Sequence, residues 1–225
     1  QERGPARFIA DLADGLIALY EASFEAKWLG AALALVDRIM RDFSDEEGIG
    51  FYDTSTAHEQ LIARPRDIQD GATPSGNSVT ANVLLRVAAM TESEELRERA
   101  MRLLETMVRP MSEQPIGFGR MLCAADLFLG PVREIAIAGT PEQPGVRGLA
   151  GVAARRYEPN AVIGLADPAQ PALIDRLPFL QFRPMRGGIA TAYLCEQHTC
   201  LPPVTTEEDL NRLLDEGTGV MWVSF

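Results

Sequence analysis

The chain has 225 residues, of which 46% are hydrophobic, and its formal net charge is −11. This length and apolar content predict a globular protein of one or two domains with a sizeable core. The acidic charge disfavours nucleic acid and anionic membranes as partners, because proteins bind both through basic patches. No apolar run is long enough for a membrane span and the N-terminus carries no signal pattern, so we expect a cytoplasmic protein.

The cysteine content and the first residue add two expectations. Three cysteines in a chain of this size do not make a disulfide framework, so the composition does not indicate an oxidising compartment. The chain begins with Gln1 rather than Met, as expected of a processed chain or of a fragment of a longer protein.

Apolar residues at helical spacing predict two N-terminal helices. The first stripe contains Phe8, Leu12, Leu16 and Leu19, and the second contains Trp28, Leu35, Val36, Ile39 and Phe43. The connection over residues 21–25 is short enough to make the two helices antiparallel neighbours. Because Trp28 lies on an apolar stripe, we expect it to pack in the core rather than to stack on a ligand.

A polar segment separates these helices from three more. The apolar pairs at 51–52 and 61–62 predict two short extended pieces that form a small hairpin. Helices are predicted over residues 78–90, 94–108 and 118–129, and Cys123 is expected to be a small core residue of the last one. The sequence Gly130-Pro131 ends that helix, because proline cannot continue its hydrogen-bond ladder.

Beyond residue 130 the pattern changes to that of an α/β unit. Short apolar runs at 132–138 and 161–166 flank a helical stretch at 145–156, which is typical of a β-α-β unit. A third strand is predicted at 191–195 and a last helix at 207–214. No glycine-rich phosphate motif follows the first strand, so we expect no dinucleotide cofactor. We therefore predict a mainly α chain with two domains, an α/α-hairpin region over 1–130 and a small α/β unit over 131–225.

The loop over residues 64–78 is the first candidate site, because it combines charges, turn formers and a helix start. Prolines and glycines fix its backbone, and Ser75 or Asn77 can cap the helix that follows. A pocket for a polar or anionic ligand can be lined here by Arg64, Arg66, Asp67, Asp70, Ser75 and Asn77. The alternative is a capped loop with a structural role alone.

Residues on both sides of this loop could add chemistry. His58 with Asp53 or Asp70 is the candidate pair for proton transfer, because histidine titrates near neutral pH and a carboxylate can orient it. Glu59 is the poorer partner, since adjacent residues of an extended segment point to opposite faces. The candidate catalytic residues are thus His58, Asp53 and Asp70, and the candidate ligand-binding residues are Tyr52, Glu59, Arg64, Ser75 and Asn77. The alternative for His58 is a solvated loop residue.

Two further candidates are Cys195 and Cys200, which are separated by four residues, His198 among them. They could be structural thiols, a reversible disulfide, or ligands of a soft metal. The spacing is not that of a thioredoxin motif, and a structural zinc site would need a fourth ligand from elsewhere, so we predict no metal. Glu196 beside the first thiol is expected to raise its pKa and so to suppress the thiolate.

Five segments of the chain carry distinctive motifs: residues 12–16 (LADGL), 48–54 (GIGFYDT), 64–78 (RPRDIQDGATPSGNS), 130–134 (GPVRE) and 195–204 (CEQHTCLPPV). These segments resemble, in matching order, the C-terminal region of the spermatogenesis-associated thioredoxin-like proteins. The resemblance runs from about Phe8 to about Leu214. It implies a thioredoxin-like domain and part of a helical barrel outside this chain, and within it a partial (α/α)6 barrel similar to those of six-hairpin glycosidases and N-acylglucosamine 2-epimerases.

The resemblance leaves three hypotheses about function. The first is a carbohydrate-type ligand pocket over residues 52–77. The second is a sugar epimerase, isomerase or glycosidase that uses His58 with Asp53 or Asp70. The third is a docking region with a redox-sensitive Cys195/Cys200 pair, because five helices cannot close a twelve-helix ring and should leave an apolar face exposed. That face would receive the missing N-terminal region or a second copy of the chain.

Overall fold

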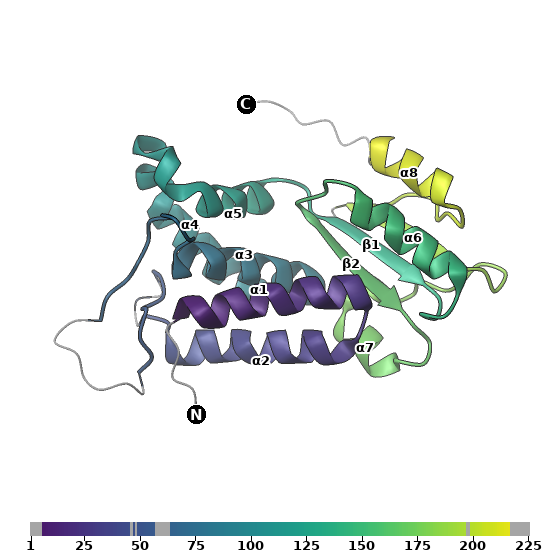
Figure 1. The fold of residues 1–225 in the computed structure, drawn as a ribbon, viewed down its shortest axis with the longest axis horizontal. Coiled ribbons are helices and arrows are strands. Elements are labelled where there is room, and N and C mark those ends of the chain that lie inside the picture. The colour runs from purple at the N-terminus through teal and green to yellow at the C-terminus, as the bar shows by residue number, and fades with distance from the viewer. Residues whose placement is uncertain (1–5, 46, 48, 57–63, 197–198, 217–225) are drawn as a thin grey trace. The chain divides into compact units, whose positions relative to one another are not determined.

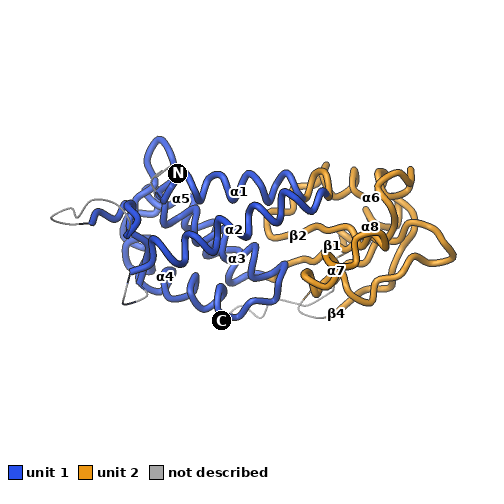
Figure 2. Tube along the Cα trace, turned by 90° about the horizontal axis from the view of Figure 1, so that it is seen from below, with its two compact units in different colours: residues 1–20, 25–130 blue, residues 21–24, 131–225 orange. Residues whose placement is uncertain are grey.

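The structure is a computed structural model that describes residues 6–45, 47, 49–56, 64–196 and 199–216. The described chain is mainly helical and carries one small mixed sheet, as the sequence predicts. It divides into two compact units (Figure 2). Unit 1 contains residues 1–20 and 25–130, and unit 2 contains residues 21–24 and 131–225.

Helical hairpins form unit 1 (Figure 1). Its helices are α1 (Ala6–Ser23, whose last residues count with unit 2), α2 (Ala26–Asp42), α3 (Gly76–Thr91), α4 (Glu94–Glu113), the short 3-10 helix η1 (Pro115–Phe118) and α5 (Gly119–Leu129). The α3–α4 turn is tight because Glu92 takes a left-handed conformation and Ser93 accepts a hydrogen bond from the Leu96 amide. These helices do not confirm a barrel of hairpins.

Helix α3 lies at the centre of unit 1. It packs against α2, α4 and α5, and residues on every side of it are buried. Small residues such as Ala81 and Ala88 let the neighbouring helices approach. The loop that precedes α3 is therefore joined to the most buried helix of the unit.

Helix α1 buries a different face from the stripe seen in the sequence. Its buried side chains are Ala6, Ile9, Ala10, Ala13, Leu16, Ile17 and Tyr20. Of the predicted stripe only Leu16 is buried, while Phe8, Leu12 and Leu19 are exposed. Both faces are apolar, so helical periodicity alone could not decide which one faces the core.

Unit 2 is a four-stranded sheet with short helices. Its elements are β1 (Arg133–Ala138), α6 (Pro144–Arg155), β2 (Ala161–Ala166), α7 (Pro171–Arg176), the 3-10 helix η2 (Pro178–Leu180), β3 (Thr191–Glu196), β4 (Thr199–Cys200) and α8 (Glu207–Glu216). The strand order is β2-β1-β3-β4. Strands β1 and β2 are parallel and joined through α6, as predicted, whereas β3 runs antiparallel to β1.

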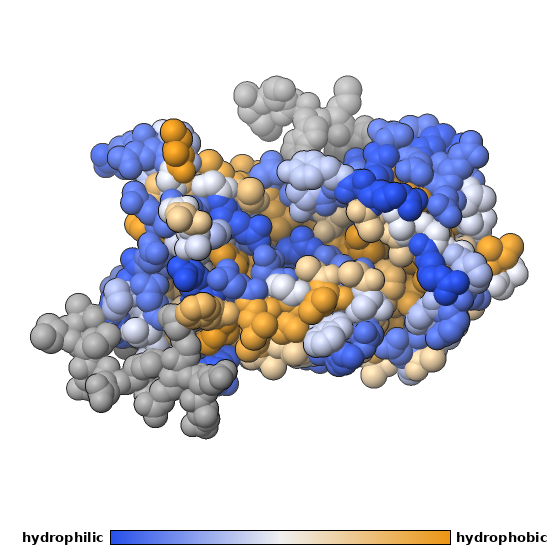
Figure 3. Space-filling view, in the orientation of Figure 1, coloured by the Kyte–Doolittle hydropathy of each residue, from blue (hydrophilic) through white to orange (hydrophobic). Residues whose placement is uncertain are grey.

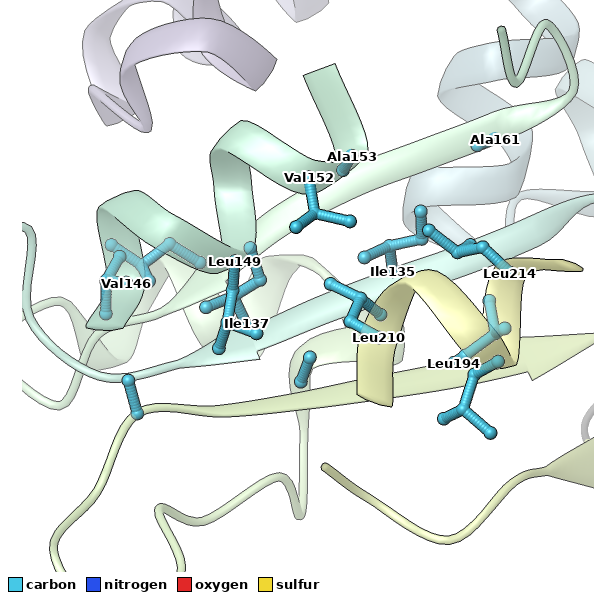
Figure 4. Close-up of a cluster of buried hydrophobic side chains, with 14 of the residues drawn as sticks. Ile135, Ile137, Val146, Leu149, Val152, Ala153, Ala161, Leu194, Leu210 and Leu214 are labelled. Atoms are coloured by element: carbon cyan, nitrogen blue, oxygen red, sulfur yellow. The ribbon is translucent and has the colours of Figure 1, made fainter. Parts of the chain in front are cut away.

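One face of this sheet carries the core of unit 2 (Figure 4). Ile135 and Ile137 of β1 point to the same face, because side chains alternate along a strand. Helix α6 contributes Leu149 and Val152 to this cluster, and α8 contributes Leu210 and further leucines. The opposite face carries Tyr193 and Cys195, which the segment after η2 approaches.

The structure corrects one sequence prediction, at Cys123, and describes only part of another, the hairpin after α2. Cys123 was predicted to be buried but is exposed, because the residues that α5 turns toward the core are Met121, Ala124 and Leu127. The predicted hairpin partner at 61–62 lies outside the described residues; within them, Phe51 pairs with Ser44.

In the described part of the chain, no helix has the length and hydrophobicity required to span a membrane.

Candidate functional site

Asn77 ties the candidate loop to the segment around Phe51. Its side chain is almost fully buried, at 1% exposure. The Oδ1 atom accepts a hydrogen bond from the Phe51 amide at 2.8 Å, and Nδ2 donates to the carbonyls of Phe51 (3.0 Å) and Asp67 (2.9 Å). The amide therefore makes three bonds to backbone groups within the protein. This geometry fits a structural clamp.

Asp70 and Ser75 cap two helices. The Ser75 hydroxyl accepts a hydrogen bond from the Ser78 amide at 3.1 Å, which makes it the N-cap of α3. One Asp70 oxygen accepts from the Ser75 amide, and the other accepts from the amides of Arg120 (2.7 Å) and Met121 (3.3 Å). Asp70 thus places a negative charge at the start of α5, where the helix dipole favours it.

The guanidinium groups of two arginines lie close to the ring of Tyr52. The Cζ atoms of Arg64 and Arg66 lie 4.0 and 4.2 Å from the ring centroid. Arg64 also donates to the carbonyls of Thr54 and Asp42, and Arg66 pairs with the buried Asp45 at 2.7 Å. These cation–π contacts compete with any sugar that would stack on this ring.

The structure describes only some of the residues that were predicted to transfer protons. His58 and Glu59 lie outside the described residues. Asp53 Oδ2 accepts a hydrogen bond from the Asp67 amide at 2.9 Å, and burial raises the pKa of this carboxyl above its usual value, with the nearby Asp67 acting in the same direction. The roles of His58, Asp53 and Asp70 in catalysis therefore stay predictions.

An open cavity of about 270 Å³ in unit 1 is formed partly by the candidate loop and partly by α4 and η1. It is lined by Ile68, Gln69, Arg109, Pro110, Glu113, Gln114 and Phe118. None of these residues was among the predicted site residues. Arg109 and Glu113 are four residues apart on α4 and form an exposed ion pair at 2.7 Å. Their helical spacing was visible in the sequence, but nothing there showed that Gln69 would face them.

The structure joins Cys195 and Cys200 in a disulfide. The two residues stand directly opposite each other on the antiparallel strands β3 and β4. Cys195 is buried, at 1% exposure, whereas Cys200 is exposed. Their role in redox exchange was predicted from sequence and is not tested by this pairing.

Arg183 lies over the disulfide and was missed by the sequence reasoning. Its Nη2 atom donates to Cys200 Sγ at 3.2 Å and to Cys195 Sγ at 3.4 Å. The residue belongs to an irregular stretch after η2, so no periodicity pointed to it. Glu196, expected to oppose a thiolate at Cys195, instead forms an ion pair with Arg133 at 2.7 Å.

Metal ligands do not gather in the described part of the chain. No group of three or more histidine, cysteine or carboxylate side chains there could hold an ion. His198, between the two cysteines, lies outside that part.

The chain is similar to vertebrate and nematode proteins. It is 34% identical to the human protein named spermatogenesis-associated protein 20 over 202 residues, which are 89% of this chain and 26% of that protein. The rat protein of that name is 33% identical over 204 residues, which are 90% of this chain and 26% of that protein. An uncharacterized protein of Caenorhabditis elegans is 21% identical over 92% of this chain and 28% of its own length.

These homologues support a relationship between this chain and the spermatogenesis-associated protein 20 family, in agreement with the sequence resemblance. The chain spans about a quarter of the length of the curated relatives that it matches. No protein-family model matches it. The thioredoxin-like domain and the barrel implied by the resemblance stay predictions.

Proposed function

We propose that this chain is a docking module of a longer protein, and that helix α1 carries its docking surface. The observation behind this proposal is an exposed apolar stripe made of Phe8, Leu12 and Leu19, which are 58%, 56% and 47% exposed. Gly15 lies between Leu12 and Leu19, and a Cβ at this position would have no atom within 4 Å apart from its two chain neighbours and the backbone of its own helix. Hydrophobic surface extends along α1 in the space-filling view (Figure 3).

The proposed occupant is the part of the relatives' chain that this chain does not cover. That part makes up about three quarters of the human relative. A stripe of two leucines and a phenylalanine suits an apolar helix of a neighbouring domain, and Gly15 leaves room for its backbone to approach. Covering the exposed halves of the three side chains should contribute roughly 3 kcal/mol to binding.

Binding to the separately expressed remainder of the human relative tests this proposal. We expect the chain to bind it in calorimetry, and the double variant Leu12→Lys/Leu19→Lys to weaken binding at least tenfold. Ile116→Lys is the matched control, because Ile116 is 98% exposed on η1 and lies outside the stripe. Equal affinity of the double variant, or a stripe that mediates only self-association of the chain, would reject the proposal.

A second candidate function is binding of a small carbohydrate-type ligand in the cavity that the candidate loop forms with α4 and η1. Its support is the set of amide, carboxylate and guanidinium groups of Gln69, Gln114, Glu113 and Arg109, which can hydrogen-bond sugar hydroxyls. We expect one member of a sugar panel to raise the melting temperature, and Gln69→Ala with Gln114→Ala to abolish the shift. A flat response across the panel would remove this candidate.

A further inference from the structure

The disulfide of unit 2 has one accessible and one protected sulfur. Cys200 is exposed at the edge of the sheet on the two-residue strand β4, whereas Cys195 is buried on β3. A thiolate from solvent can therefore approach Cys200 Sγ but not Cys195 Sγ. Thiol–disulfide exchange depends on which sulfur is accessible and on how well the other sulfur leaves.

Arg183 is placed to stabilise the leaving sulfur. Its guanidinium contacts both Sγ atoms, at 3.2 and 3.4 Å, and lies 5.5 Å from the centroid of the Tyr193 ring. The Tyr193 hydroxyl donates to the carbonyl of Pro184 at 2.6 Å, which fixes the backbone next to Arg183. Among the described residues Arg183 forms no ion pair, and its Nε is buried without a hydrogen-bond partner.

Two other charged residues, Glu196 and Glu134, lie near the disulfide on β3 and β1. Glu196 follows Cys195 on β3, so its side chain points to the opposite face, where it pairs with Arg133 at 2.7 Å. Glu134 stands opposite Cys195 in the β1–β3 register, on the same face of the sheet, and would oppose a thiolate there. Within the described part of the chain, Arg183 is the positively charged group in contact with both sulfurs.

We propose that the Cys195–Cys200 disulfide is a thiol-exchange site for a dithiol reductant, with Arg183 as the residue that holds the departing Cys195 sulfur. A thiolate of the dithiol attacks Cys200 Sγ and forms a mixed disulfide. The Cys195–Cys200 bond breaks, and its electron pair goes to Cys195 as a thiolate beside Arg183. The second thiol of the reductant then attacks its own sulfur in the mixed disulfide and releases Cys200. Two electrons and two protons pass from the dithiol to the two cysteines.

Reduction of the full chain by dithiothreitol without denaturant tests this site. Thiols are alkylated at intervals and counted by mass spectrometry, with the exposed Cys123 as the internal reference for a free thiol. We expect the disulfide to be reduced, and Arg183→Gln to slow the reduction about tenfold because it removes the positive charge from the leaving group. Arg183→Lys should recover most of the rate.

Two further readouts separate this role from a structural one. Arg186→Gln makes the same substitution at an exposed position three residues after Arg183. The disulfide of this variant should be reduced at the native rate. With glutathione, a monothiol, the mixed disulfide should form at Cys200 rather than at Cys195 in fragmentation spectra. A disulfide that resists dithiothreitol until the protein unfolds, an unchanged rate in Arg183→Gln, or glutathione on Cys195 would overturn the proposal.

Discussion

Replacing Asn77 by alanine should lower the free energy of unfolding by about 3 kcal/mol. The substitution removes three hydrogen bonds and leaves the Phe51 amide and the carbonyls of Phe51 and Asp67 without these partners in a buried site. Buried groups that lose their partner carry a desolvation cost, which exceeds the small gain from the helix propensity of alanine. Urea denaturation followed by circular dichroism measures the change.

Two variants test the reason for this loss. Asn77→Asp keeps the shape and the acceptor for the Phe51 amide but replaces the donor with a charged oxygen that faces two carbonyls, so it should cost at least as much as Asn77→Ala. Asn211→Ala is the matched control, because Asn211 is partly exposed on α8 and donates one bond, to the carbonyl of Glu207. An Asn77→Asp variant of native stability would show that packing, not hydrogen bonding, fixes this residue.

Replacing Gly139 by alanine should destabilise unit 2 by roughly 3 kcal/mol. Gly139 follows β1 and has a φ of 153°, a conformation that residues with a Cβ rarely adopt. A Cβ there would stand 2.5 Å from Val146 Cγ2 in the core and 2.5 Å from Gln143 Oε1. The latter atom accepts a hydrogen bond from the Thr140 amide, so moving the side chain also disturbs the start of α6.

The control for Gly139 is the same substitution in α2. A Cβ at Gly30 would have no atom within 4 Å apart from its chain neighbours and the backbone of its own helix. Alanine also restricts the unfolded chain, so Gly30→Ala should raise the free energy of unfolding by about 0.5 to 1 kcal/mol. Hydrogen exchange can assign each effect to its unit. Equal stability changes in the two variants would mean that neither the backbone conformation nor the close contacts at Gly139 matter.

Helix and strand positions could be predicted because they depend on local signals. Ser75 was one of two candidate caps, and the structure selects it because its hydroxyl meets the Ser78 amide, while Asn77 is turned toward Phe51. Helix α7 and strand β4 were missed, since six and two residues carry too little periodicity to detect.

The candidate site was harder to predict because its contacts span long distances in sequence. The loop residues were noticed for their polarity, but polarity does not tell a ligand-binding side chain from one that bonds to the protein backbone. Asn77 reaches Phe51 across 26 residues, and Arg183 reaches the disulfide from a segment with no regular structure. Only the folded chain brings these groups together.

Asp70 makes the beginning of α5 depend on a residue far earlier in the chain. The amide of Arg120 bonds to a carboxylate 50 residues away, so the first turn of α5 loses this cap whenever the earlier loop detaches. We therefore expect the two segments to open together, so that their amide protons gain access to solvent in one step. Long-range capping of this kind should also delay the last helix of unit 1 during folding, because a large chain segment must close before the helix acquires its cap.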